Sequence, residues 1–349
     1  MKGFKKIIIW TLIPIMMELV GLLYIDQFYL NDETSFNATK VDVTSKKEPN
    51  KIKVKIPEEA KNIGVSYTGN YISYYQDGVI KVVDTSNNKE KELKVDGDAQ
   101  ISSYKWLADR DIMLIAEKYN GGGNSNYLKF ESYNAKKDEK TVLSDDKNKQ
   151  LKISLADDKY EVLDMALSSA TNVTYVKVGK DGAKSRIYRI NVMAQVEETK
   201  YVSSKLGKIT AANKEDKLIY EDTTGNRIRV AGAKNPIATG ENAIHYLLST
   251  DSEDRVYIGN GENNKVKKIF IGSVKTGSQQ WKTVNLSQQT SKNDIYITTS
   301  GKIYINNPSS NVIRELETGK ETKYEGTLIN VYNLGIISEN KGKLIGNLF

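Results

Sequence analysis

The feature that most constrains this chain is a recurrence of short strand-like runs, each closed by a turn, over residues 51 to 349. The clearest copy is NIGVSYTGNYISYYQDGVIKVVDTSNNKEKELKV at 62–95, where Asp77-Gly78 is a strong signal for a two-residue hairpin turn. Similar runs, each ending in an outer strand rich in Lys, Glu and Thr, occupy residues 101–143, 162–202, 208–239, 244–286 and 294–324. Almost no stretch shows helical spacing, so the sequence predicts an all-β domain of antiparallel strands.

The period of this recurrence predicts the architecture. Repeats of about 40 to 50 residues that hold four strands each are typical of the blades of a β-propeller. Residues 328–349 supply too few strands for a blade, but KIKVKIP at 51–57 resembles the outer strands of the other copies. Pairing of this piece with the C-terminal strands would complete a seventh blade and leave no strand edge exposed. We expect seven blades; six blades, or a pair of β-sandwich domains, are the alternatives.

An apolar run near the N-terminus, IIIWTLIPIMMELVGLLYI at 7–25, has the length of a membrane span. Its 19 residues would form a helix of roughly 28 Å. Lysines precede the run and acidic residues follow it, which favours a cytoplasmic N-terminus. We expect residues 1–6 to be a cytoplasmic basic stub, 7–25 an uncleaved signal anchor, 26–50 a polar stalk and 51–349 an extracytoplasmic domain. A cleaved signal peptide is the alternative.

Three residues characterise the expected anchor. Trp10 lies near its start, Pro14 removes one helical hydrogen bond, and Glu18 places an ionisable group inside the apolar run. An intramembrane carboxyl group is a candidate contact for a polar or basic group on another membrane helix. A helix that inserts with Glu18 protonated is the alternative.

Composition excludes several kinds of chemistry. The chain has no Cys, which rules out disulfides, Cys-ligated zinc, iron–sulfur clusters and thiol nucleophiles. The single histidine, His245, has no metal-ligand spacing around it, and no nucleophile elbow, P-loop or dinucleotide fingerprint is present. We therefore predict no catalytic residue, metal or cofactor. Residues 1–25 carry +2 of the net charge of +7, and the remaining +5 is interleaved along the strands, which indicates a soluble surface with a weak attraction to anionic wall polymers more than a nucleic-acid site.

Candidate partner contacts come from one loop and a few aromatic side chains. The loop holds Asn120, Gly122 and Asn124 between two expected strands, without the helix that a phosphate cradle requires. Strand alternation sends Tyr74 and Tyr75 to opposite faces, so that one packs between blades and the other meets solvent. The remaining candidates are Trp106, Trp281 and His245, for which packing between blades is the alternative.

Residues 51–349 resemble, as architecture, extracytoplasmic β-propellers of the TolB-like and WD-repeat-like class. The Gly-His and Trp-Asp dipeptides of WD repeats and the Asp-box of sialidases are absent. The resemblance implies rigid loop faces suited to binding, so we expect a membrane-tethered protein-interaction or scaffold module in a bacterial cell-envelope assembly. The excess of Lys, Asn and Ile favours a Gram-positive source. One alternative is a carbohydrate-active or wall-polymer-binding propeller with Asp or Glu in its funnel, and another is a ligand-sensing ectodomain.

Overall fold

The computed structural model of the protein describes residues 2–28, 52–95, 97–121, 126–181, 183–203, 205–274 and 281–349. The chain divides into two compact units, Met1–Glu48 and Pro49–Phe349. The first contains helix α1 (Lys2–Phe28), which continues beyond the point where the stalk was expected to begin. Among the described residues, no helix is both long and apolar enough to cross a membrane, and the span over residues 7–25 stays a prediction. The rest of the predicted stalk, residues 29–50, lies outside the described residues.

The second unit is built from seven antiparallel sheets, called blades 1 to 7 here in chain order. Blade 1 contains β2 (Lys61–Val65), β3 (Tyr71–Gln76), β4 (Val79–Asp84) and β5 (Glu90–Leu93). Blade 2 contains β6 (Gln100–Trp106), β7 (Ile112–Tyr119), β8 (Tyr127–Asn134), β9 (Glu139–Val142) and β10 (Lys152–Ser154). Blade 3 contains β11 (Glu161–Ser168), β12 (Val173–Gly179), β13 (Arg186–Ile190) and β14 (Val196–Glu198).

The remaining blades follow the same order of strands. Blade 4 has three strands, β15 (Leu206–Ala211), β16 (Leu218–Asp222) and β17 (Arg227–Val230). Blade 5 contains β18 (Ile244–Thr250), β19 (Arg255–Glu262), β20 (Lys265–Ser273) and β21 (Lys282–Ser291), and the 3-10 turn η2 (Lys292–Asp294) follows it. Blade 6 contains β22 (Ile295–Ile297), β23 (Ile303–Asn307), β24 (Val312–Glu315) and β25 (Glu321–Lys323). Blade 7 contains β26 (Thr327–Val331), β27 (Gly335–Asn340), β28 (Lys343–Leu348) and β1 (Lys53–Lys55).

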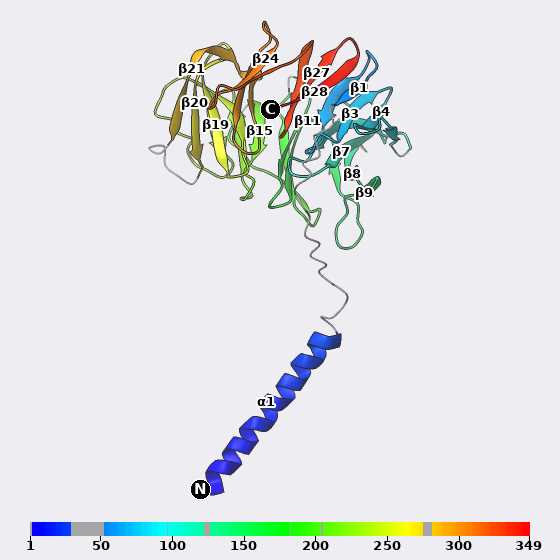
Figure 1. The fold of residues 1–349 in the computed structure, drawn as a ribbon, viewed down its shortest axis with the longest axis vertical. Coiled ribbons are helices and arrows are strands. Elements are labelled where there is room, and N and C mark those ends of the chain that lie inside the picture. The colour runs from blue at the N-terminus through cyan, green and yellow to red at the C-terminus, as the bar shows by residue number, and fades with distance from the viewer. Residues whose placement is uncertain are drawn as a thin grey trace. The chain divides into compact units, whose positions relative to one another are not determined.

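The seventh blade joins the two ends of the domain. β1 pairs antiparallel with β28, with Val54 opposite Leu344, so the first strand of the domain forms the outer strand of the last blade (Figure 1). Ile52, Val54 and Ile56 are buried in a core shared with blade 1, whereas Lys53 and Lys55 are exposed. The alternation in KIKVKIP therefore gives the apolar side chains to the core and the lysines to solvent. The predicted closure is confirmed.

The first strand of each blade lies at the centre of the ring. Contacts link these inner strands in sequence, from β2 to β6, β11, β15, β18 and β22, and from β26 back to β2. A β-bulge or register shift interrupts every inner strand except the short β22, for example between Val162 and Asp164 in β11. Bulges increase local twist and redirect side chains, so the bulged inner strands shape the lining of the ring's centre.

Both faces of each blade are covered by its neighbours. Tyr74 is buried in the core between blades 7 and 1, and Tyr75 packs against the core between blades 1 and 2. Tyr74 is therefore the side chain that packs fully between blades, whereas Tyr75 is half-buried and keeps part of its surface in solvent although it contacts the neighbouring blade.

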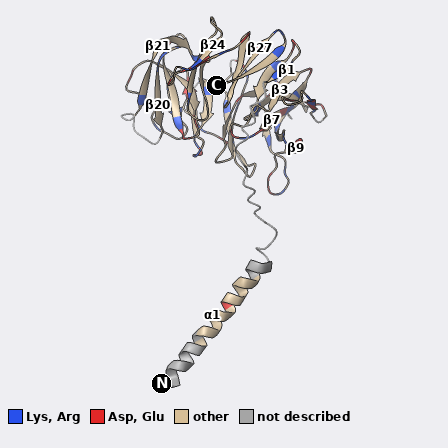
Figure 2. Cartoon of the chain, viewed as in Figure 1, with Lys and Arg blue, Asp and Glu red and all other residues tan. Residues whose placement is uncertain are grey.

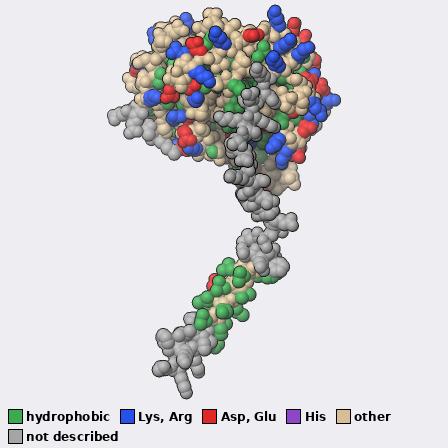
Figure 3. All heavy atoms as spheres, in the orientation of Figure 1, with side chains coloured by type: hydrophobic (Ala, Val, Ile, Leu, Met, Phe, Trp, Pro, Cys, Tyr) green, Lys and Arg blue, Asp and Glu red, His purple; other side chains and the backbone are tan. Residues whose placement is uncertain are grey.

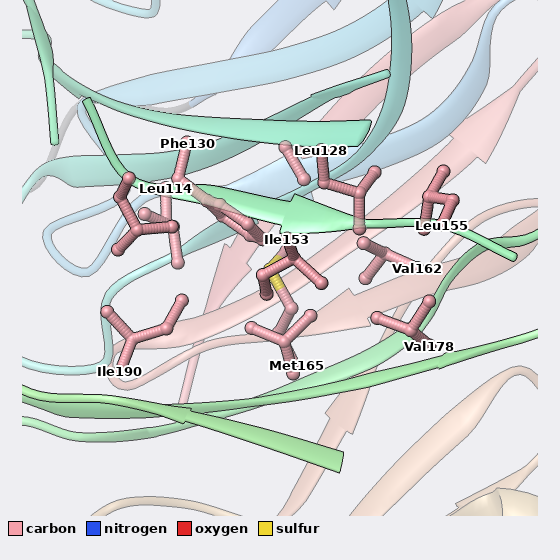
Figure 4. Close-up of a cluster of buried hydrophobic side chains, with 12 residues drawn as sticks. Leu114, Leu128, Phe130, Ile153, Leu155, Val162, Met165, Val178 and Ile190 are labelled. Atoms are coloured by element: carbon pink, nitrogen blue, oxygen red, sulfur yellow. The ribbon is translucent and has the colours of Figure 1, made fainter. Parts of the chain in front are cut away.

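Blade 2 carries an additional strand that the sequence analysis did not identify. The outer position beside β8 is shared: β9 pairs with residues 131–134 of β8, and β10 pairs with residues 127–129. Leu151, Ile153 and Leu155, in and beside β10, fill the core between blades 2 and 3 (Figure 4). The alternation of LKISL was the signal for this strand.

The closure predicts a test by substitution on β1. Val54→Ala removes two buried methyl groups from the core between blades 7 and 1 and should lower the free energy of unfolding by about 2 kcal/mol. Lys53→Gln, on the exposed side of the same strand, should change it by less than about 0.5 kcal/mol. Denaturant unfolding of the two variants checks this, and equal effects would contradict the role of β1 in the core.

Candidate functional site

A cavity of about 470 Å³ opens at the centre of the ring, where each inner strand turns into the second strand of its blade. Every blade contributes to this central mouth. Its lining is mainly small and polar, with Ser169, Asn213, Thr299 and Asn333 among the residues that face it. Such a surface offers hydrogen-bond donors and acceptors from rigid strand ends, which is typical of a binding face more than of an apolar ligand pocket.

Hydrogen bonds between adjacent blades hold the rim of the mouth. Donor–acceptor distances are 2.5 to 3.2 Å in five bonds: Thr68 to Asp111, Ser168 to Asn213, Asn213 to Asp254, Ser252 to Thr299 and Thr299 to Asn333. Between blades 7 and 1, the ring of Tyr332 lies against Gly69, where an added Cβ would approach it to 2.7 Å. Within the described residues, no such contact links blades 2 and 3 at the rim.

The carboxylates at the mouth are already engaged. Asp109 accepts a hydrogen bond from Arg110 Nε at 3.0 Å. Asp251 accepts hydrogen bonds from Arg255 Nε at 2.5 Å and from the Tyr257 hydroxyl at 2.8 Å. These contacts orient the two carboxylates within the rim, and the two arginines balance their negative charges.

Deeper in the ring, a cavity of about 610 Å³ is lined by the inner strands of blades 1, 2, 3 and 7. Lys105 lies 3.6 Å from Asp164 and donates a hydrogen bond to the Met165 carbonyl at 2.5 Å. Burial lowers the pKa of Lys208 on β15, and the charge of Lys105 adds to this effect. Glycoside hydrolysis requires two carboxyl groups that flank the scissile bond, one as general acid and the other as general base or nucleophile. Among the described residues, Glu161 is the one acid that lines this cavity, and Asp164 beside it forms an ion pair with Lys105.

A groove between blades 2 and 3 runs into the central mouth. It has a volume of about 540 Å³, and Leu167 and Ser169 line both cavities. Leu107, Leu143 and Ile190 give it an apolar floor. The groove lies beside β9, whereas β10 fills the other half of the same interface. The split outer position of blade 2 therefore leaves an open space on the side that faces the mouth.

The rim of this groove presents apolar side chains to solvent. Val192, which lines the groove, is 72% exposed, and its neighbour Met193 is 50% exposed, in the turn between β13 and β14. The side chain of Asn191 accepts hydrogen bonds from the backbone N–H groups of Met193 and Gln195, each at 3.0 Å, which fixes the turn. The sequence analysis did not select these residues. Two adjacent apolar residues in a hairpin turn were the available signal.

The aromatic candidates from the sequence lie inside the blades. Trp106 is 9% exposed, donates a hydrogen bond to Ser73 Oγ at 2.9 Å and stacks on Tyr71. Trp281 packs against Gly272 and the core between blades 4 and 5. Of the loop candidates, Asn120 is exposed at the end of β7, and Gly122 and Asn124 lie outside the described residues. These side chains do not converge on one surface.

His245 is buried at the start of β18 with polar partners on both ring nitrogens. Nδ1 lies 2.7 Å from the Ala243 carbonyl, and Nε2 lies 2.6 Å from Thr239 Oγ1. Burial lowers the pKa of His245, although the hydrogen bond to Ala243 opposes the shift. This is the environment of a neutral, structural imidazole.

One buried ionic cluster shifts the pKa values of two glutamates but lines none of the cavities described above. Lys129 lies 2.8 Å from Glu131, and Lys140 lies 3.0 Å from Glu117, with both glutamates fully buried. Burial raises the pKa of Glu117, whereas the ammonium groups of Lys129 and Lys140 outweigh burial at Glu131 and lower its pKa. The cluster balances two cations against two carboxylates inside blade 2, which indicates a structural role.

Comparisons with known proteins support this fold and identify no family for the chain. No family model and no curated protein matches the chain. The β-propeller domain of Cps50 (Swd1) from Myceliophteria thermophila aligns with a TM-score of 0.53 and 11% identity, covering 85% of this chain and 100% of that one. The chain is a seven-bladed β-propeller.

Two further solved structures are similar at comparable identity. A prolyl endopeptidase aligns with a TM-score of 0.51 and 10% identity over 77% of this chain, which spans only 42% of that enzyme. A chain of a mitotic checkpoint complex aligns with a TM-score of 0.49 and 13% identity, covering 84% of this chain and 93% of that one. At these identities a likeness shows the fold alone.

The buried His245 predicts a pH effect on stability. Because folding lowers its pKa, the unfolded state takes up a proton below the ordinary value of 6.5, and the free energy of unfolding should fall as the pH drops below that value. His245→Gln should lose this component, which has a slope of up to about 1.4 kcal/mol per pH unit. Urea unfolding from about pH 7.5 to about pH 5 compares the two proteins, and parallel profiles would contradict the neutral buried state.

Proposed function

We propose that this protein is a membrane-tethered, extracytoplasmic interaction module that holds a partner protein in a bacterial cell-envelope assembly. The observation that carries the proposal is the groove between blades 2 and 3, which is continuous with the central mouth through Leu167 and Ser169. An extended segment of another protein fits this shape, because its apolar side chains would cover the groove floor while its backbone meets the polar mouth.

Two properties of the groove support a protein as the occupant. Its rim exposes Val192 and Met193 in a turn that is already fixed by Asn191, so little ordering is required when a partner covers them. The mouth itself is rigid, because hydrogen bonds tie its rim together across blades. Preorganised surfaces with a few exposed apolar anchors are typical of protein-binding sites.

The tether is proposed from the sequence of residues 7–25. Within that run, Trp10 and Met17 are each 75% exposed and Val20 is 65% exposed, so the helix presents large apolar side chains on its surface. Lipid is the occupant that the flanking charges favour, with the lysines before the run in the cytoplasm and the propeller outside. Glu18 would then be available to a polar group on a neighbouring membrane helix.

The groove is tested with a photo-crosslinking amino acid in place of Val192 in the full chain, produced in its native host. Position 192 should crosslink to a defined protein, whereas the same amino acid at Val202, which is 64% exposed in the connection from β14 to β15, should not. β14 runs away from the end of blade 3 that holds the groove, so Val202 is a matched site of similar exposure.

A second pair of variants tests the contact itself. Val192→Glu places a charge in the covered apolar rim and should reduce the crosslink from a probe at Ser169 by about tenfold, equivalent to about 1.4 kcal/mol of binding. Val202→Glu should leave that yield unchanged. Equal crosslinking at both positions, or no effect of Val192→Glu, would exclude the groove as the binding site.

The tether predicts the location and the N-terminus of the protein. The full chain should sediment with membranes and retain residues 1–25, and protease added to intact protoplasts should digest the propeller while a cytoplasmic control protein survives. Mass spectrometry of the membrane-bound protein locates its first residue. An N-terminus near residue 26 or later would indicate a cleaved signal, and a propeller protected until lysis would contradict the orientation.

A further inference from the structure

A second groove, remote from blades 2 and 3, follows the strand that closes the ring. It lies between blades 7 and 1 and has a volume of about 700 Å³. Four exposed lysines line it: Lys53 and Lys55 on β1, Lys341 in the turn after β27, and Lys343 at the start of β28. Lysine and arginine side chains are prominent where Figure 1 places β1 and β27 (Figures 2 and 3).

The positive charge of this groove is not neutralised by the described residues that surround it. None of the four ammonium groups forms an ion pair or hydrogen bond within the described part of the chain. Of the two carboxylates in the lining, Glu90 lies 3.2 Å from Lys81, and Glu325, which accepts a hydrogen bond from the neutral amide of Asn340 at 3.1 Å, offsets one of the four lysine charges. The groove therefore carries an excess of free cations.

Part of this charge is placed unfavourably for stability. Lys55 and Lys343 are directly opposite each other in the pairing of β1 with β28. Like charges in this position destabilise an antiparallel pair of strands. The pair weakens the strand pairing on which ring closure depends, and an anion that bridges the two ammonium groups would remove this repulsion.

We propose that this groove binds an extended polyanion that carries phosphate groups. Lys53 and Lys55 point to the same side of β1, about 7 Å apart along the strand, and Lys343 and Lys341 continue the charge across β28 and its turn. A row of this length matches a chain of anionic groups better than a single ion.

The choice of cation favours phosphate over carboxylate. All four basic side chains in the lining are lysines, with no arginine among the residues that face the groove. Arginine presents a planar fork that suits bidentate carboxylate recognition, whereas lysine is a point charge that binds phosphate without a fixed geometry. This proposal does not depend on a protein in the groove of blades 2 and 3, because the two grooves share no lining residue.

The test uses the full chain in neutral detergent and fluorescently labelled inorganic polyphosphate as the probe. Binding should be measurable at low salt and weaken as salt rises, because counterions are released from the polymer. Lys343→Glu should reduce the affinity by about tenfold. It should also make the slope of the logarithm of the binding constant against the logarithm of the salt concentration shallower by about one. Because Lys343→Glu places a carboxylate opposite Lys55, the melting temperature should stay the same or rise. A loss of affinity in this variant would then not be caused by unfolding.

The matched control is Lys234→Glu/Lys265→Glu, which removes two exposed lysines on blades 4 and 5. Its affinity for polyphosphate should stay within about twofold of the parent, although its net charge falls by more than that of Lys343→Glu. An equal or greater loss in this control would show charge attraction without a site and would overturn the proposal.

Two competitors separate the other sources of the same chemistry. Orthophosphate at the same phosphate concentration should compete poorly, because one ion spans at most two of the lysines. Vesicles of phosphatidylglycerol and phosphatidylcholine should bind no better to the parent than to Lys343→Glu. Effective competition by orthophosphate, binding to these vesicles but not to polyphosphate, or no binding to polyphosphate at all would each overturn the proposal.

Discussion

The pairing of β1 with β28 is the interaction on which the rest of the propeller depends. It brings residues about 290 positions apart in the chain into one sheet, with Val54 opposite Leu344 and both side chains buried. Without it, β28 would expose an unpaired edge, and the core between blades 7 and 1 would lose Ile52, Val54 and Ile56. The central mouth exists only in a closed ring, because its rim bonds run from blade to blade.

Closure also decides which side chains are available for function. In a ring of sheets packed face to face, large aromatic side chains pack between neighbouring blades, as Trp106 and Trp281 do here. The accessible surface is made of the strand ends, the turns and the outer strands. The mouth is therefore lined by residues such as Ser169 and Asn213, and the exposed apolar residues Val192 and Met193 stand on a turn.

The parts of the fold that follow from local chemistry could be predicted from the sequence. Asp77 and Gly78 both adopt positive φ, at 51° and 85°, in the hairpin that their sequence indicated. The alternation of KIKVKIP and the incomplete last repeat together predicted the closing strand. The contact of Tyr75 with the neighbouring blade could not be predicted in the same way, because alternation gives the face of a strand but not what covers that face. β10 was missed because one short alternating run inside a polar connection does not reveal that two strands share one partner.

The candidate sites lie where the repeat is irregular. Blades that pack in the same way on both sides leave equivalent and well-filled interfaces, so a selective surface requires a departure from the repeat. At blades 2 and 3, β9 and β10 divide the outer position, and β10 fills the core while a groove opens beside β9. At blades 7 and 1, the outer strand comes from the other end of the chain and carries lysines where the outer strands β5, β9 and β25 mix Lys with Glu. Glu92 lies opposite Lys81 in blade 1, whereas Lys55 lies opposite Lys343 in blade 7. The first pair stabilises its sheet and the second does not, and this departure from the repeat is the observation on which the proposed polyanion site rests.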